Sequence, residues 1–412
     1  MSKQQTPNIR FQGFSGDWEE KTLGDIFEIS SASRVLKEQW QKEGVPFFRT
    51  SDVVAAFKGE NNEKAFISFE LFEDLSKKSG RPQKGDLLVT GGGSIGIPFL
   101  ISNDNPIYFK DADLLWFKSA EKTDGNFLFY SLFGKKFKEY LKSISHTGTI
   151  SHYTIVQAKC TPITLPSETE QTQIGQFFQT LDRLIAQSKA TLSKSQQLKK
   201  AMLAKMFPMA GETVPQIRFK GFTGAWERKK LGEIADIVRG ASPRPIQDPK
   251  WFDDSSDIGW LRISDVTAQN GRIHYLEQKI SKAGQENTRV LEEPHLLLSI
   301  AASVGKPVIN YVKTGVHDGF LIFRSPDFEL EFMFQYLDSF VESWQCYGQP
   351  GTQVNLNSDI VKNADFFIPP TPEEQTAIGN FFRQLDDTIT LQQAELAKLT
   401  QLKKALLAVM LV

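Results

Sequence analysis

Residues 168–207 read ETEQTQIGQFFQTLDRLIAQSKATLSKSQQLKKAMLAKMF, and this stretch decides the fold. Apolar residues recur in it at spacings of three and four, which predicts one long helix with a single apolar stripe. At 1.5 Å rise per residue the helix is about 58 Å long, far beyond the usual globular helix. Its stripe therefore needs a partner larger than one small domain.

The same pattern returns after Pro370, displaced by 204 residues, and the two copies share the motifs Glu-Gln, Phe-Phe, Leu-Asp and Leu-Lys-Lys-Ala in one order. We expect the two helices to pair with each other. The stripe residues assigned to this coiled coil are Ile174, Phe178, Leu181, Ile185, Leu192, Ile378, Phe382, Leu385, Ile389 and Leu396. After a shift of phase, the stripe of the first helix continues to Leu198, Met202 and Met206, and that of the second continues to Leu402, Leu406 and Met410.

Ser188 and Gln392 interrupt the two stripes at matching places. Buried polar groups at such places can set the register of a coiled coil at a cost in stability. The alternative is that each helix is an ordinary amphipathic helix packed on its own domain.

A second repeat precedes each helix. The segment PNIRFQGFSGDW at residues 7–18 returns as PQIRFKGFTGAW at residues 215–226, so the repeat unit is an entry segment, a globular part and a long helix. Within the globular parts, Arg49–Val53 matches Arg262–Val266. The differences concentrate in loops, which is where binding specificity usually lies on a shared scaffold. These loops are residues 31–44 against 241–259, and 143–153 against 346–355.

Short apolar runs such as residues 86–90, 97–101 and 114–117 are typical of strands separated by Gly, Pro and Asn turns. We therefore expect two small mixed α/β domains. The predicted boundaries are a first domain with its entry segment at 1–166, a long helix at 167–207, a linker and second domain at 208–370, and a second long helix at 371–412.

The overall charge is −1, from 48 basic and 49 acidic residues, and by itself it does not indicate a nucleic-acid partner. Residues 23–160 carry +1, whereas residues 231–365 hold 12 basic and 19 acidic residues, a balance of −7. A polyanion would therefore meet local positive faces and not a general field.

The two cysteines, Cys160 and Cys346, and the lack of an apolar span or basic leader lead us to expect a cytoplasmic protein without membrane contact.

Several catalytic signatures fall short. Gly91–Gly96 fits a dinucleotide fingerprint, but Ile97-Pro98 cannot open a helix, so we interpret it as a turn between strands. Asn105–Tyr108 resembles an amino-methyltransferase motif with Ile in the third place, and we interpret it as a turn entering a strand. Pro326–Glu331 ends in Glu where a nuclease motif has Lys, and Asp386-Asp387 are assigned to the solvated side of their helix. The five histidines lack metal-ligand spacing, so we expect a chain that is not an enzyme and has no cofactor or metal of its own.

The entry motif, the helix openings and the Leu-Lys-Lys-Ala tails, each present twice, resemble the specificity subunits of type I restriction-modification systems. This resemblance covers nearly the whole chain. It implies two target-recognition domains separated by two long helices that pair antiparallel, with each domain reading one half of a bipartite site in double-stranded DNA. It also implies two modification subunits that carry S-adenosylmethionine, and restriction subunits that use ATP and Mg.

On this interpretation the divergent loops contact bases, because Arg, Lys, Ser, Thr and Gln side chains read base edges. The candidate DNA-binding residues are Arg34, Lys37, Ser94, His146, Thr147 and Thr149 in the first domain, and Arg239, Ser242, Arg244, Ser303, Gln349 and Gln353 in the second. Arg49 and Arg262 lie in the shared motif, so phosphate contact suits them better. The alternative for these two is a structural ion pair with Asp52 or Asp265.

The acidic second domain predicts that the chain alone binds DNA weakly and that specific binding requires the modification subunits.

Two other functions stay open. One is a non-enzymatic tandem scaffold that binds proteins and dimerises through its coiled coil, and the other is a self-sufficient methyltransferase that uses Asn105–Tyr108.

Overall fold

The computed structural model describes residues 6–110, 112–119, 123–144, 152–209, 211–300, 304–347 and 356–411. The chain forms two compact units, the first from Met1–Lys189 and Ala394–Val412 and the second from Ala190–Gln393. Each unit therefore holds one globular part together with portions of both long helices, α7 (Glu168–Met206) and α13 (Pro372–Met410).

The first unit is built from short strands and helices. Its elements before α7 are β1 (Glu19–Thr22), α1 (Leu23–Ile26), β2 (Ile29–Ser30), η1 (Lys37–Gln39), β3 (Val45–Phe48), α2 (Thr50–Lys58), β4 (Ala65–Ile67), α3 (Phe69–Ser79), β5 (Leu87–Thr90), β6 (Pro98–Leu100), β7 (Tyr108–Phe109), β8 (Leu114–Phe117), α4 (Gly125–Ser131), α5 (Lys135–Ile144), α6 (Ile155–Lys159) and β9 (Pro162–Leu165). The strands form sheets of order β2-β8-β5-β6, β4-β3-β7 and β1-β9.

The second unit repeats this plan with additions. Its elements are β10 (Glu227–Lys230), α8 (Leu231–Ile234), β11 (Asp236–Arg239), η2 (Pro249–Trp251), β12 (Gly259–Trp260), α9 (Ile263–Ala268), β13 (Arg272–Ile273), α10 (Lys282–Gln285), β14 (Arg289–Leu291), β15 (Leu296–Ser299), β16 (Pro307–Asn310), β17 (Thr314–Val316), β18 (Phe320–Arg324), α11 (Leu330–Ser339), η3 (Glu342–Tyr347), α12 (Ser358–Asn363) and β19 (Asp365–Ile368). The sheets are β11-β18-β15-β16-β13, β12-β17-β14 and β10-β19.

The two units share one topology. In each, the strand after the entry segment pairs antiparallel with the strand that leads into a long helix, as β1 with β9 and β10 with β19. The central order β2-β8-β5-β6 corresponds to β11-β18-β15-β16, and β3-β7 and β12-β17 are both parallel pairs. The predicted mixed α/β class and internal repeat are thus confirmed.

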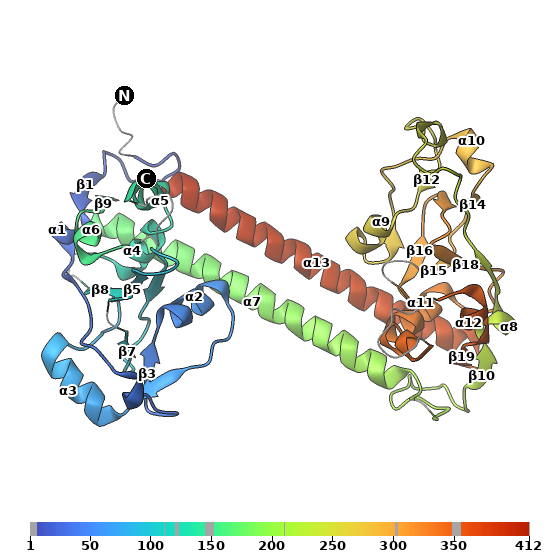
Figure 1. The fold of residues 1–412 in the computed structure, drawn as a ribbon, viewed down its shortest axis with the longest axis horizontal. Coiled ribbons are helices and arrows are strands. Elements are labelled where there is room, and N and C mark those ends of the chain that lie inside the picture. The colour runs from blue at the N-terminus through green and yellow to red at the C-terminus, as the bar shows by residue number, and fades with distance from the viewer. Residues whose placement is uncertain are drawn as a thin grey trace. The chain divides into compact units, whose positions relative to one another are not determined.

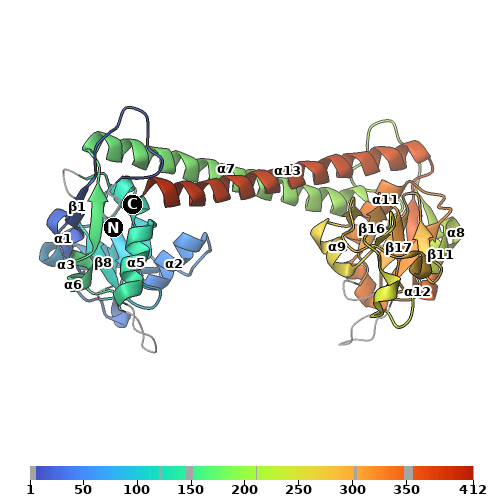
Figure 2. The ribbon, with the colours of Figure 1, turned by 90° about the horizontal axis from the view of Figure 1, so that it is seen from above.

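Each long helix begins inside the core of its own domain. Ile174, Phe178 and Leu181 of α7 are buried in the core of the first unit, and Ile378 and Phe382 of α13 are buried in that of the second. The far end of the other helix completes each core, with Met410 and Leu411 in the first unit and Met206 and Phe207 in the second. Within each unit the start of one long helix thus lies beside the end of the other, as an antiparallel pair (Figures 1 and 2).

The middle of the stripe is less covered than the sequence predicts. Ile185, Leu192, Leu385, Ile389 and Leu396 are half-buried. Leu198 and Leu402 are 45% exposed, and their assignment to the stripe was wrong. Leu203 and Leu399 pack against the cores in their place, because the phase of each helix shifts where it meets a globular part. Among the described residues, Ser188 Oγ and Gln392 Oε1 are buried without a hydrogen-bond partner.

Candidate nucleic-acid interface

The repeated entry motif is fastened to the repeated helix opening by a buried ion pair. Arg10 contacts Glu170 through Nε to Oε1 at 2.6 Å and Nη2 to Oε2 at 2.7 Å, and it donates from Nη1 to the carbonyl of Gly16. Gly16 has φ of +83°, a conformation that glycine adopts without strain. Arg218 and Glu374 repeat these contacts with the same distances. The hydrogen bond to the partner glutamate raises the pKa of each arginine, so both guanidinium groups stay charged.

The Leu-Asp and Leu-Lys-Lys motifs meet across the helix pair. In the second unit, Lys199 Nζ of α7 lies 2.7 Å from Asp386 Oδ1 of α13. In the first unit the roles are exchanged, and Lys403 of α13 pairs with Asp182 of α7. Each aspartate also accepts a hydrogen bond of 2.7 Å from the helix after the central sheet, from Tyr130 Oη or from Gln335 Nε2.

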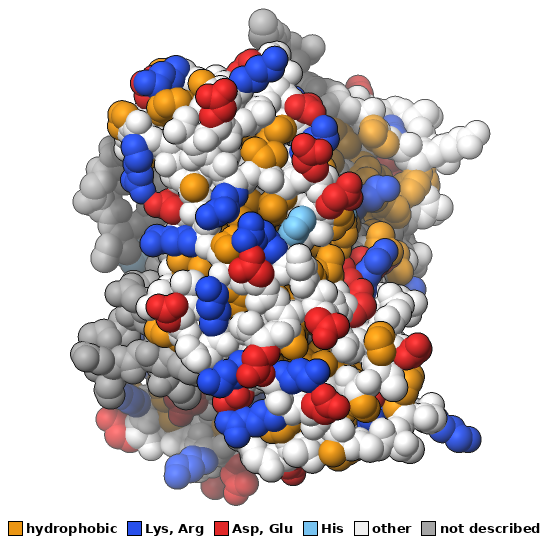
Figure 3. Space-filling view, turned by 90° about the vertical axis from the view of Figure 1, so that its right-hand side faces the viewer, with side chains coloured by type: hydrophobic (Ala, Val, Ile, Leu, Met, Phe, Trp, Pro, Cys, Tyr) orange, Lys and Arg blue, Asp and Glu red, His pale blue; other side chains and the backbone are white. Residues whose placement is uncertain are grey.

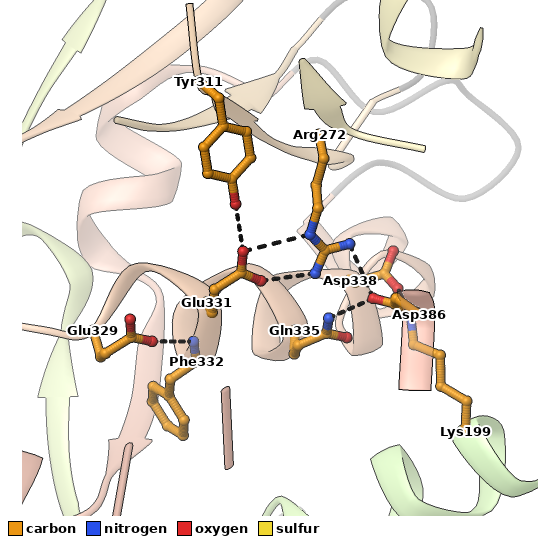
Figure 4. Close-up of polar contacts among 9 residues, drawn as sticks. All are labelled: Lys199, Arg272, Tyr311, Glu329, Glu331, Phe332, Gln335, Asp338 and Asp386. Atoms are coloured by element: carbon orange, nitrogen blue, oxygen red, sulfur yellow. Dashed lines mark hydrogen bonds and ion pairs between the residues drawn. The ribbon is translucent and has the colours of Figure 1, made fainter. Parts of the chain in front are cut away.

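The second unit extends this contact into a larger network (Figure 4). Arg272 Nη1 lies 3.0 Å from Asp386 Oδ2, and Arg272 Nη2 lies 2.7 Å from Glu331 Oε2. Tyr311 donates its hydroxyl hydrogen to Glu331, and Lys199 also approaches Asp338 at 3.4 Å. Burial alone lowers the pKa of Arg272, but the contacts with Glu331 and Asp386 raise it by more. The pKa is therefore above its ordinary value, and the guanidinium stays protonated. The placement of Asp386 on the solvated side was wrong, since its side chain is 16% exposed and lies between three partners.

The shared arginines cap short helices. Arg49 precedes α2 and binds Asp52 through Nε to Oδ2 at 2.8 Å, and its guanidinium lies over Trp40. Arg262 precedes α9 and binds Asp265 through Nη2 to Oδ1 at 2.8 Å. Both ion pairs proposed as the alternative to phosphate contact are therefore formed. Their hydrogen bonds to the aspartates raise the pKa of both arginines.

In the first unit, three of the candidate base-reading residues are placed and all three are exposed. Arg34 and Lys37 lie on the loop that includes η1, and Ser94 lies in the β5–β6 turn. That turn is closed by the Thr90 hydroxyl, which accepts from the Ile97 N–H at 2.9 Å. His146, Thr147 and Thr149 lie outside the described residues.

In the second unit, the structure brings three candidates together around one residue that sequence reasoning missed. Arg239 donates from Nε to the carbonyl of Asp318, Ser242 donates to its Oδ1, and Arg244 donates to its Oδ2. Asp318 is 74 to 79 residues away from these partners and no sequence motif marked it. Ser303, Gln349 and Gln353 lie outside the described residues.

The motifs that imitated catalytic signatures have structural roles. Gly91–Gly96 forms the turn between β5 and β6, and Tyr108 opens β7, as predicted. Tyr108 is fully buried, and its hydroxyl contacts the Ser33 N–H and Ser79 Oγ. Glu329 caps α11 and Glu331 forms an ion pair with Arg272. Both carboxylates of the segment that resembles a nuclease motif therefore make structural contacts.

Within the ranges that the structure describes, no group of three or more His, Cys, Asp or Glu side chains is placed to hold a metal ion. No described helix is long and apolar enough to cross a membrane. On one face of the second unit, the described basic and acidic side chains are interspersed without a large area of one sign (Figure 3).

Comparisons with known proteins find similar sequences. A family model for the type I restriction modification DNA specificity domain matches residues 15–195 and 224–401. A putative type I restriction enzyme specificity subunit from Haemophilus influenzae is 30% identical over 169 residues, which are 40% of this chain and 41% of that protein. The putative type I restriction enzyme MjaX specificity subunit from Methanocaldococcus jannaschii is 23% identical over 417 residues, covering 96% of this chain and 93% of that protein.

A crystal structure of a type I restriction-modification system S subunit from M. genitalium has the same fold. The TM-score is 0.62 at 15% identity, and the match covers 99% of both chains. Because the family model matches each repeat separately and together the two matches span most of the sequence, the chain belongs to the type I restriction-modification specificity family and carries two DNA specificity domains in tandem.

Proposed function

We propose that this chain is the DNA-recognition subunit of a type I restriction-modification complex, in which each globular domain reads one half of a bipartite site in double-stranded DNA. The observation that carries this proposal is a scaffold used twice with different loops. The buried Arg-Glu pair, the capped helix and the central sheet recur in both units, whereas the loops at 31–44 and 241–259 differ in length and residues. Shared scaffolds with divergent loops suit the recognition of two different half-sites.

The long helices set the spacing between the half-sites and dock the modification subunits. Half-sites on one face of a duplex lie about one helical turn apart, roughly 34 Å, and a helix of 39 residues rises about 58 Å. Apolar side chains remain for partners on both helices, since Leu184 of α7 is 45% exposed and Leu391 of α13 is 71% exposed. Two such helices serve two modification subunits.

Catalysis belongs to the partners in this proposal. The modification subunits bind S-adenosylmethionine, the restriction subunits use ATP and Mg, and this chain selects the sequence in the cytoplasm. The burial of Tyr108 and the hairpin at Gly91–Gly96 support a non-catalytic role, because the Tyr108 side chain is packed inside the fold and the glycine-rich segment joins two strands and does not open a helix.

The test is to co-express the chain with its modification subunit and to map methylated bases across host DNA by long-read sequencing. We expect two short half-sites at one fixed spacing, and replacement of residues 23–160 by another first domain changes one half only. A complex that forms but methylates no motif would refute DNA reading and favour the protein-binding scaffold. Methylation by the chain alone would instead favour the self-sufficient enzyme.

A further inference from the structure

Asp318 is the centre of a small polar cluster at one end of the β11–β18 pair. Its Oδ1 accepts from Ser242 Oγ at 2.8 Å, its Oδ2 accepts from Arg244 Nη2 at 2.5 Å, and its carbonyl accepts from Arg239 Nε at 2.6 Å. A third arginine joins them, since Arg289 Nε donates to the carbonyl of Arg239 at 2.7 Å. Arg244 is thus the arginine that binds the carboxylate itself, and Arg239 and Arg289 join the cluster through backbone carbonyls, in a domain whose balance is −7. The cluster holds three arginines and one aspartate, so positive charge is locally in excess here although the domain as a whole is acidic.

The first unit has no carboxylate at the place that corresponds to Asp318. In the second unit the N–H of Ile300 donates to the carbonyl of Gly319, and in the first unit the N–H of Gly91 donates to that of Asp113. This correspondence places Ala112 where Asp318 stands, two residues before the equivalent strands β8 and β18.

The local backbone contact is the same at both places. The Ala112 N–H donates to Ser31 Oγ at 3.0 Å, and the Asp318 N–H donates to Ser242 Oγ at 3.2 Å. The first unit thus keeps the serine contact with a methyl group in place of the carboxylate. By contrast, scaffold pairs such as Arg49 with Asp52 and Arg262 with Asp265 occur in both units.

We propose that Asp318 is a positioning residue for sequence recognition, whose carboxylate holds Arg244 so that Arg244 reads guanine in the half-site of the second domain. This inference rests on the proposed DNA-reading function. Arg244 is 71% exposed, and among the described residues its Nε and Nη1 have no partner, so these donors face solvent. Arginine reads guanine through O6 and N7, which is the commonest specific contact in the major groove.

Positioning matters because a free arginine loses rotamer entropy when it is fixed. A carboxylate that already holds one side of the guanidinium reduces that loss before DNA arrives. Partial burial raises the pKa of the Asp318 carboxyl, but the Ser242 hydroxyl and then the arginines lower it below its ordinary value overall. The carboxylate therefore remains ionised at neutral pH.

The experiment compares Asp318→Asn and Arg244→Ala with the unmodified chain, each assembled with the modification subunit, by methylation mapping and by initial methylation rates on a duplex that carries the wild-type site. We expect both variants to relax the preference for one guanine in the second domain's half-site by about tenfold. The other half-site serves as an internal control and remains unchanged. In the double variant the two effects do not add, because Asp318 acts through Arg244.

Asp236→Asn is the matched control. It removes an Asp-Arg pair from the opposite end of the same two strands, where Asp236 contacts Arg324, and it leaves both half-sites unchanged. An unchanged motif and rate in Asp318→Asn would overturn the inference, as would an equal loss at both half-sites with a lower melting temperature. If the unmodified complex methylates no bipartite site, DNA reading itself fails, which is a distinguishable result.

Discussion

Lys199 on α7 and Asp386 on α13 lie 2.7 Å apart, and 204 residues separate each from its counterpart in the other pair, Lys403 and Asp182. One short motif at the start of each helix therefore meets another motif near the end of its partner. A repeated ion pair of this kind fixes the register of antiparallel helices, because a shift by one turn moves the lysine away from the carboxylate.

The first prediction concerns Asp386. Replacement by Ala leaves Arg272 and Lys199 without a shared partner, and we expect a loss of about 3 kcal/mol in the free energy of unfolding of the second unit. Urea denaturation followed by tryptophan fluorescence measures it. The adjacent Asp387 is exposed, so Asp387→Ala is the control and changes little. Equal effects of the two variants would contradict the role given to Asp386.

The second prediction concerns the buried pair of Arg218 and Glu374. Arg218→Ala leaves a carboxylate that is 1% exposed without its partner, and we expect a cost of about 3 to 5 kcal/mol. Thermal unfolding of the purified chain gives the result. Arg228→Ala removes an exposed contact with Asp365 in the same unit and should leave the melting temperature nearly unchanged. A stable Arg218→Ala chain would show that the entry segment is not held by this pair.

The third prediction is a pH dependence that arises from His317. Burial lowers the pKa of His317, although Asp318 opposes the effect. The unfolded state therefore binds the proton more readily, so this contribution to stability is complete above about pH 6.5 and is lost as pH falls toward the folded pKa. We expect His317→Gln to reduce the loss of stability between pH 7 and pH 5. Melting temperatures across this range test it, with the exposed His152 in the first unit changed to Gln as the control. Identical pH profiles for wild type and His317→Gln would disprove the assignment.

The fourth prediction separates base reading from phosphate contact in the first unit. Both Arg34 and Lys37 are exposed on one loop, and both are candidate base readers. We expect Arg34→Ala and Lys37→Ala each to change base preference in one half-site, with a loss of about 1 to 3 kcal/mol on the cognate sequence, whereas loss of a phosphate contact would weaken all sequences and reduce the salt slope by about one. Fluorescence anisotropy with the assembled complex at several salt concentrations distinguishes base reading from phosphate contact. A uniform effect of Arg34→Ala would place that side chain on the backbone.

Repetition and periodicity in the sequence determined the architecture. The spacing of Ile174, Phe178 and Leu181 predicts a helix because the 3.6-residue period is a local property, and the second copy after Pro370 predicts another. The β5–β6 turn and the β8 strand also followed from neighbouring residues. The coiled-coil and DNA-binding assignments remain predictions, with Arg34, Lys37, Ser94, Arg239, Ser242 and Arg244 placed and the other loop candidates outside the described residues.

Only the tertiary structure decided which distant residues meet. Arg10 and Glu170 are 160 residues apart, and strand pairing brings Asp318 beside Arg244 across 74 residues. A helical period assigns a residue to a face of its own helix, but it does not state what covers that face, which is why Leu198 was misplaced and why Asp386 was assigned to solvent. Those outcomes depend on the packing of a domain against each helix end, and packing is a property of the whole folded chain.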